Sequence, residues 1–501
     1  MAHLLFHNFR FFVYFIGARA ADQDLNKNGK FTLYMHHRHI FLILLLAPLQ
    51  ISQYSMSDHS WMANFGGSTP WGDWKHYHNY TEIVNTLLYL NDTYPDFLDV
   101  FSIGKSWQNR DIYCIRLTNK NVTRLKSEVF FVGYHHAREL ISSELPLYFA
   151  VEAATNYGTD PTITYMIDNS QMYILVALNV DGFKAVQANE WQRKNVHPFD
   201  EDGDGLVDDD PPEDWDGDGY IEALWQEDGS EWSFIRWEGI DDDGDGLLNE
   251  DWVGGVDLNR NYGYAWNASV QSGTTNPQDE AYKGPMPFSE PETQAIRDFA
   301  LKHDFEYAIS FHSGTNLIIY PWGYTDTPTL HDSTFREVAA DLSSLVDAPY
   351  GQSGDGLYTA SGLWDDWMYG NCSTLAFTCE IYEDSNAWQY ERGPYPNSWW
   401  EKGVFEFFNP EPENIEKVIL RWLPVFTYVT NRAISEAATG DLKADLNGDG
   451  MVNILDLSMV AHSFSSHPGD DRWNELCDLN HDNIVNVVDL ATVAVEYGKT
   501  A

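Results

Sequence analysis

Short apolar runs alternate with amphipathic helical patterns through most of this 501-residue chain, and this alternation constrains the fold more than any other feature. Apolar residues at helical spacing occur before and between the runs, at 80–90, 142–157 and 290–303. Strands that alternate with helices predict an α/β domain with a mixed, mainly parallel sheet and helices on both faces. Functional residues are then expected beyond the carboxyl ends of the strands. The predicted strands are 112–117, 128–133, 172–180, 307–311 and 374–379.

The formal net charge of −46 is concentrated in one segment. Residues 200–251 contain 22 acidic residues and a single basic one, Arg236. A chain of this charge is repelled by nucleic acid and by anionic membrane surfaces, so we expect no nucleic-acid partner. The segment is either a solvated acidic loop or a cation-binding insert, and the spacing of its carboxylates bears on the choice.

The first 55 residues are typical of a leader region. The sequence Met35-His-His-Arg-His precedes the apolar run 40–49, and polar residues follow from Gln50. About ten apolar residues after a charged stretch indicate a secretory signal, and such a run is too short to span a bilayer. The alternatives are a start at Met1 with a weaker signal at 11–20, or a buried apolar helix. We expect a secreted or cell-surface protein without a transmembrane span in its mature form.

Three residues form a candidate zinc site. His136 and Glu139 follow the predicted strand 128–133 at three-residue spacing, so both can reach one ion, and His135 is interpreted as a structural neighbour. His312 follows the strand 307–311 and should meet them at the same sheet edge. Two histidines and one glutamate leave a fourth position open for water, as in catalytic zinc sites. Because this spacing also occurs without a metal, the motif alone is a weak signal.

Further motifs along the chain resemble those of the zinc carboxypeptidase family that includes carboxypeptidases A, B and T. Together with His136-Ala-Arg-Glu139 and His312 they cover about 75–436, the expected catalytic domain. They are Trp191-Gln-Arg193-Lys-Asn, Asp257-Leu-Asn259-Arg260-Asn261, Tyr358-Thr-Ala-Ser-Gly with Asp366-Trp367, and Phe377-Thr-Cys-Glu380.

The resemblance implies a role for each residue and a zinc-dependent hydrolysis of the C-terminal peptide bond of peptides or proteins. Glu380 would be the general base that takes a proton from the attacking water, and Arg193 would stabilise the oxyanion. Arg260 would bind the free C-terminal carboxylate of the substrate. Asn259 and Tyr358 would add hydrogen bonds to that carboxylate.

Two more residues bear on substrate choice. Arg138 would be a secondary contact for a substrate carboxylate. Asp365 stands where an aspartate marks the family members that prefer C-terminal Lys or Arg. In the alternative interpretation Asp365 turns to solvent or caps a turn, and Leu363 and Trp364 shape an apolar pocket.

Two other functions remain compatible with the same motifs. The first is a zinc deacylase or amidohydrolase on the same fold, although Asn259, Arg260 and Tyr358 favour the exopeptidase. The second is a catalytically inactive, calcium-stabilised binding protein, which an intact Glu380 disfavours.

The acidic insert, 197–253, contains three Asp-x-Asp-Gly-Asp-Gly units. Carboxylates at positions 1, 3 and 5 with glycine at position 6 form the front half of an EF-hand-type calcium loop. The acidic residue of position 12 is missing from each unit, so the units resemble calcium-binding Asp-Gly repeats. The candidate calcium ligands are Asp200, Asp202, Asp204, Asp214, Asp216, Asp218, Asp241, Asp243 and Asp245.

The tail, 441–498, contains two similar loops that each lead into an apolar helix. It resembles a type I dockerin, which implies two calcium ions and a cohesin-like or cell-surface partner. Ile454-Leu455 and Val487-Val488 depart from the family, whose partner-contacting positions usually carry small hydroxyl residues. The residues at positions 1, 3, 5, 9 and 12 are Asp445, Asn447, Asp449, Asn453 and Asp456 in the first loop, and Asp478, Asn480, Asp482, Asn486 and Asp489 in the second.

Overall fold

The computed structural model describes most of the chain after residue 70. The expected leader, 1–55, lies outside the described residues, as do Asp202, Asp204, Asp243, Asp245 and Asp449. The described residues are 71–124, 126–200, 205–228, 231–242, 244, 246, 248–249, 251, 254–439, 444–447, 451–470, 472–480 and 482–498.

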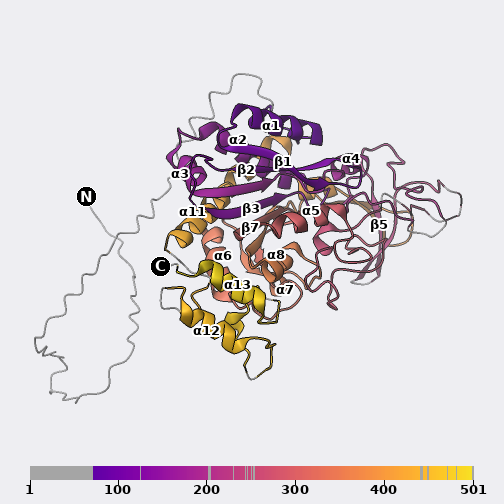
Figure 1. Ribbon diagram of the computed structural model, residues 1–501. Helices are drawn as coiled ribbons and strands as arrows, with labels where there is room; N and C mark the ends of the chain where they lie inside the picture. Colours follow the sequence, from indigo (N-terminus) through magenta and orange to yellow (C-terminus); the bar gives the residue numbers. More distant parts are fainter. Residues whose placement is uncertain are drawn as a thin grey trace, which may run out of the picture. The chain divides into compact units, whose positions relative to one another are not determined.

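A mixed eight-stranded sheet lies at the centre of the fold before the tail, with the strand order β1-β2-β4-β3-β7-β10-β8-β9. Figure 1 labels four of its strands, β1, β2, β3 and β7. The four central strands, β4, β3, β7 and β10, run parallel, whereas β1, β2 and β8 pair antiparallel with their inner neighbours. This confirms the predicted mixed, mainly parallel α/β fold. The strands are β1 Leu98–Lys105, β2 Asp111–Leu117, β3 Ser127–Gly133, β4 Ser170–Leu175, β7 Phe305–His312, β8 Thr315–Tyr320, β9 Tyr350–Gln352 and β10 Leu375–Tyr382.

Helices cover both faces of this sheet, because neighbouring residues of a buried strand point to opposite sides. The Phe130 ring of β3 lies 5.5 Å from that of Phe299 on α5, whereas the Phe131 ring lies 6.3 Å from Phe149 on α2 and 4.5 Å from Phe426 on α11. The helices around the sheet are α1 Tyr80–Thr93, α2 Ile141–Asn156, α3 Pro161–Asn169, α4 Gly182–Ala188, α5 Pro291–Ala300, α6 Asp332–Val346, α7 Ser353–Gly356, α8 Trp364–Cys372, α9 Val404–Phe408, α10 Ile415–Trp422 and α11 Pro424–Thr439. Within the described residues, no helix is long and apolar enough to cross a membrane.

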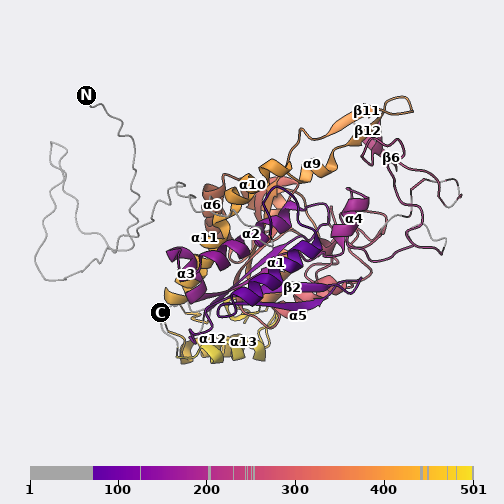
Figure 2. The same ribbon diagram turned by 90° about the horizontal axis from the view of Figure 1, so that it is seen from above.

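A second, four-stranded antiparallel sheet, β11-β12-β5-β6, was not predicted. Its strands β5 (Ala223–Asp228) and β6 (Glu231–Trp237) lie in the acidic insert, and β11 (Gln389–Arg392) and β12 (Ser398–Lys402) follow β10. Figure 2 shows β6, β11 and β12 grouped next to α9, at the side of the domain away from α3 and α6. The insert is therefore more than a solvated loop.

The tail folds around a small core of its own. The helices α12 (Ile454–Ser463) and α13 (Val487–Glu496) each begin with a capping box, in which an asparagine and the aspartate three residues later exchange hydrogen bonds. The buried residues between the two helices are Ala444, Val452, Val460, Cys477, Val485 and Val493.

A buried ion pair links His78, in the segment that precedes α1, with Glu144 on α2. The helix α2 follows the predicted zinc motif. His78 Nδ1 lies 2.7 Å from Glu144 Oε2, and the backbone N–H of His78 donates to Glu144 Oε1. Burial alone would lower the pKa of His78, but the hydrogen bond and charge of Glu144 raise it above the ordinary value of 6.5. The pair therefore stabilises the fold fully below about pH 6.5, and this contribution is lost as the pH rises through the raised pKa.

We predict that Glu144→Gln lowers the free energy of unfolding by about 3 kcal/mol at pH 6, because it leaves a buried imidazolium without its counter-ion. The deficit should shrink at pH 9, where the native His78 is neutral. Urea unfolding of both proteins at the two pH values measures it. An equal deficit at pH 6 and pH 9 would contradict the charged pair.

Candidate active site

The parallel strands bring the predicted zinc-binding residues and Glu380 to one edge of the sheet. His136 and Glu139 lie in the turn between β3 and α2, and His312 is the last residue of β7. Glu380 pairs in register with His312 across β7 and β10, so the two side chains lie on the same face. All four side chains line one cavity of about 270 Å³.

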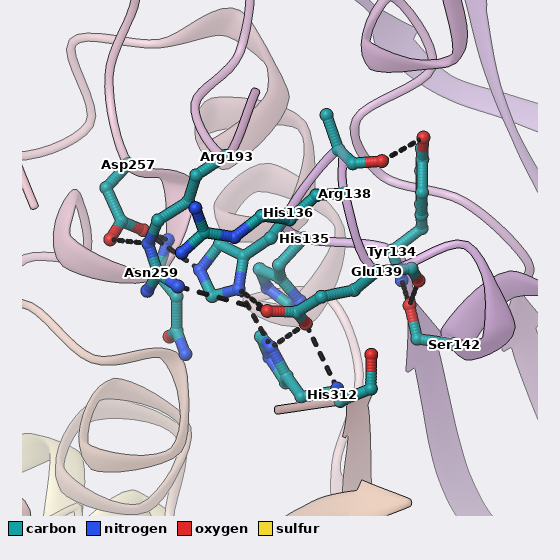
Figure 3. Close-up of polar contacts among 12 residues, drawn as sticks. Tyr134, His135, His136, Arg138, Glu139, Ser142, Arg193, Asp257, Asn259 and His312 are labelled. Atoms are coloured by element: carbon teal, nitrogen blue, oxygen red, sulfur yellow. Dashed lines mark hydrogen bonds and ion pairs between the residues drawn. The ribbon is translucent and has the colours of Figure 1, made fainter. Parts of the chain in front are cut away.

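Three ligand-type atoms converge in this cavity. His136 Nδ1 lies 2.7 Å from Glu139 Oε1, and His312 Nδ1 lies 2.9 Å from Glu139 Oε2. The two Nδ1 atoms are 3.2 Å apart, and all three side chains are buried. Figure 3 shows the three side chains pointing toward one another.

This donor set fits a zinc ion. Two buried imidazole nitrogens that face each other are best satisfied by a shared cation, and two histidines with one carboxylate form a three-ligand catalytic set. Although burial alone would raise it, the neighbouring His136 and His312 hold the pKa of Glu139 well below its ordinary value. Glu139 is therefore ionised, as a metal ligand must be.

Asp257 connects this set to the arginine of the site. Its Oδ1 lies 3.1 Å from His136 Nε2, and its Oδ2 accepts a hydrogen bond from Arg193 Nε at 3.0 Å (Figure 3). Burial opposes its ionisation, but Arg193, Arg260 and His136 hold the pKa of Asp257 well below the ordinary value. A carboxylate in this position fixes the imidazole so that Nδ1 faces the metal site. Asp257 is the first residue of the 257–261 motif, and no role for it was predicted from the sequence.

Glu380 presents a half-buried carboxyl group to the cavity beside the convergent atoms. Burial, followed by the charge of Glu139, raises the pKa of Glu380 to about 7. A carboxyl group with a pKa near neutrality can both accept and return a proton, which suits a general base.

The residues expected to hold a substrate carboxylate lie together in the wall of the same cavity. Arg260 Nη2 donates to the Tyr358 hydroxyl at 3.2 Å, and Arg260 Nε donates to Ser272 Oγ. The Oδ1 atom of Asn259 accepts the backbone N–H of Trp364 at 2.9 Å, which fixes the orientation of the amide. A guanidinium held in this way presents its remaining donors in a planar fork.

Arg138 already has a carboxylate partner within the chain. Its two terminal nitrogens donate to the two oxygens of Glu280 at 2.9 and 3.0 Å, and its guanidinium lies 4.5 Å from the centre of the Phe408 ring. Glu280 was not predicted from the sequence, because it lies 142 residues away from Arg138 along the chain.

Asp365 lines the same cavity and is buried at the start of α8. Burial raises its pKa to about 6, and its Oδ1 accepts the backbone N–H of Asp366. Leu363, Ile319 and Ala360 line the cavity as well. Asp365 therefore does not turn to solvent, and its carboxyl group belongs to a cavity wall that also contains apolar side chains.

In the acidic insert, the loop that begins at Asp214 makes hydrogen bonds that its sequence alone did not indicate. Asp214 accepts the backbone N–H groups of Gly217, Asp218 and Gly219, and Asp200 likewise accepts that of Gly205. The side chain of Glu238, at the end of β6, accepts backbone N–H groups at positions 2, 3 and 9 of the loop that begins at Asp214.

In the two tail loops, the equivalent hydrogen bonds from backbone N–H groups go to the side chain at position 12. There the position-12 side chains, Asp456 and Asp489, accept the N–H groups of positions 3 and 9. Glu238 therefore makes the contacts of the missing position-12 residue from a distant segment. Asp210 does the same for the loop that begins at Asp241, since it accepts the N–H groups of positions 2 and 9.

The family model described as zinc carboxypeptidase matches residues 83–420, and the model described as dockerin type I domain matches residues 443–496. Human carboxypeptidase A6 is 28% identical over 314 residues, which cover 61% of this chain and 60% of that protein. Carboxypeptidase B of Astacus astacus is 27% identical over 63% of this chain and 89% of its own length. The chain thus spans about three fifths of the human relative.

Solved structures share the fold at low sequence identity. The crystal structure of thrombin activatable fibrinolysis inhibitor aligns with a TM-score of 0.56 at 20% identity, over 74% of this chain and 77% of that one. Carboxypeptidase A from Helicoverpa armigera aligns with a TM-score of 0.53 at 21% identity, over 76% and 79%. With the family model matching residues 83–420, which carry every residue of the site, the chain belongs to the zinc carboxypeptidase family.

Proposed function

We propose that this protein is a secreted, zinc-dependent carboxypeptidase that hydrolyses the C-terminal peptide bond of peptides and proteins. One observation carries the proposal: the convergent His136, Glu139 and His312 share a cavity with the Arg260–Tyr358 pair. A metal-binding hydrolase needs only the first group, whereas an exopeptidase also needs a bidentate donor for the free carboxylate. This favours the exopeptidase over a deacylase or an inactive binding protein.

Zinc in this site would polarise the scissile carbonyl and lower the pKa of water. Arg260 holds the terminal carboxylate and thereby places the last peptide bond in the cavity. Glu380 takes a proton from the attacking water and passes it to the departing amine, which its raised pKa permits. Arg193, held by Asp257, donates to the carbonyl oxygen as negative charge develops there.

We predict that Glu380→Gln keeps the fold and the bound zinc but lowers kcat by ~10²–10⁴-fold, because the amide cannot accept the proton. Stopped assays of C-terminal residue release, together with zinc content by mass spectrometry, measure both effects. Glu383→Gln, an exposed carboxylate just after β10, serves as the matched control and should keep native rates. Near-native turnover by a zinc-loaded Glu380→Gln enzyme would refute this role.

For the departing side chain, we propose a preference for Lys or Arg. Asp365 is a buried carboxylate in the cavity wall, and an ionised carboxylate facing an apolar side chain costs free energy that a cation removes. Its pKa of about 6 means that Asp365 gains its charge as the pH rises from 5 to 7.

The ratio of kcat/KM for C-terminal Arg to that for C-terminal Leu should therefore rise about tenfold or more between pH 5 and pH 7. Asp365→Asn should flatten this pH dependence and lower the ratio, because it keeps the shape of the side chain without its charge. This ratio is measured with peptides that differ only in their C-terminal residue, and effects of pH on the catalytic groups cancel in it. A native enzyme that prefers Leu at pH 7, or an Asp365→Asn enzyme with an unchanged ratio, would exclude the preference.

We also propose that the tail binds two calcium ions and attaches the enzyme to a cohesin-like or cell-surface partner. The paired loops with carboxylates at positions 1 and 12 support the calcium sites. Ile454 and Val487 are each 64% exposed at the starts of α12 and α13, which favours a partner with an apolar face. The insert loops at Asp214 and Asp241, completed by Glu238 and Asp210, are proposed as further calcium sites.

Chelation of calcium should make residues 441–498 susceptible to protease in the full-length chain and leave the catalytic domain intact, because the loop carboxylates then repel one another. Asp445→Ala with Asp478→Ala should reproduce this in the presence of calcium, and native mass spectrometry should show two fewer calcium ions. Glu475→Ala removes an exposed carboxylate outside both loops and should have no effect. An unchanged cleavage pattern with and without calcium would count against these sites.

A further inference from the structure

The second sheet presents an aromatic face that the proposed chemistry does not use. Residues opposite one another on neighbouring strands point to the same face, and Trp399, Trp225 and Phe234 form such a row across β12, β5 and β6. From the edge strands, the rings of Trp232 and Tyr390 meet over this row at 6.4 Å. We call Trp225, Trp232, Phe234, Tyr390 and Trp399 the aromatic face.

Much of this face is accessible to solvent. Trp232 is 48% exposed, Phe234 45% and Tyr390 52%, whereas Trp225 and Trp399 are partly buried beneath them. Grouped exposed aromatic rings are uncommon on a soluble surface unless they bind something.

The aromatic face is connected to the candidate active site by an unbroken series of ring contacts. The series starts at Phe408, which lines the active-site cavity and packs under Arg138. Each centroid-to-centroid step is between 4.9 and 5.8 Å. From Phe408 the rings are, in order, Phe407, Trp388, Trp191, Trp237 and Phe234.

These ring contacts limit the distance between the active-site cavity and the aromatic face. Five such steps cannot span more than about 30 Å, which about nine residues of an extended chain cover at ~3.3 Å per residue. If Arg260 holds the substrate carboxylate, the rest of the polypeptide leaves the cavity past the metal-binding residues. Arg138, which belongs to the same turn as His136 and Glu139, and Phe408 lie on that side.

We propose that the aromatic face is an exosite for the substrate polypeptide, contacting apolar and aromatic side chains up to about nine residues before the C-terminus. The inference rests on the proposed exopeptidase function and names the substrate class for it: polypeptides rather than dipeptides. The charged side chains around the aromatic face further restrict the class of polypeptide substrates. Two carboxylates, Glu227 and Glu401, point to this face together with one guanidinium, that of Arg392, which lies 4.8 Å from the centre of the Trp399 ring, and the insert as a whole has 22 acidic residues. The bound segment therefore carries basic residues among its apolar ones.

Three substrates with one C-terminal dipeptide test this: the N-blocked dipeptide, a twelve-residue peptide with two aromatic residues six to nine positions upstream, and the same peptide with serine in their place. The native enzyme should favour the aromatic peptide over the serine peptide by about tenfold in kcat/KM, mainly through KM, as one well-buried ring contact would give. Trp232→Ser with Tyr390→Ser should abolish this difference and leave hydrolysis of the dipeptide unchanged.

Tyr89→Ser with Tyr165→Ser is the matched control, because these tyrosines are similarly exposed but lie on α1 and α3. Equal rates for the two long peptides with the native enzyme, or a preference that survives in the Trp232/Tyr390 variant, would overturn the exosite. The exosite would also be overturned if the Trp232/Tyr390 variant kept the peptide preference but lost dimer formation that the native enzyme shows. Loss of native retention on an insoluble polysaccharide, with the peptide preference kept, would overturn it in the same way. Failure of the native enzyme to hydrolyse even the dipeptide would instead contradict the proposed exopeptidase.

Discussion

The arrangement of the site depends on the buried carboxylate of Asp257. It contacts the imidazole of His136 on one side and the guanidinium of Arg193 on the other, and it also caps the short turn that carries Asn259 and Arg260. One ionised group therefore fixes a metal-binding residue, the proposed oxyanion donor and the start of the carboxylate-binding wall. A buried carboxylate with these partners stays charged, because its burial is offset by neighbouring cations.

The sheet supplies the second constraint. Parallel strands end at a common edge, so His312 and Glu380 lie side by side, and the turn after β3 brings His136 and Glu139 against them. Residues far apart in the chain thus line one cavity, to which the long segments before and after the second sheet add Arg193, Asn259 and Arg260. The second sheet lies next to the same region, because Ala223, Trp225 and Trp237 of this sheet belong to the cluster around Trp191, two residues before Arg193.

Much of this could be predicted from the sequence where the signal is local. The buried strands and the α/β class follow from apolar runs and helical spacing, and the candidate zinc-binding residues were predicted from their positions at strand ends and from the family motifs. The predicted strand 172–180 extended beyond β4, which ends at Leu175, because apolar residues continue into the following turn. The second sheet was missed because only its β5–β6 and β11–β12 pairings are local, whereas the pairing of β5 with β12 joins segments more than 150 residues apart. Glu280, Glu238 and Asp210 were missed for the same reason: each completes a contact in a distant segment.

The proposed exopeptidase recognises a free C-terminal carboxylate in the cavity that holds the candidate metal-binding triad. It is tested most directly by mass spectrometry of one peptide offered to the zinc-loaded protein in two forms, with a free and with an amidated C-terminus. We expect the free acid to lose its last residue and the amide to stay intact, because the amidated peptide offers Arg260 no carboxylate to bind. Equal hydrolysis of both forms, or cleavage within the peptide, would contradict it.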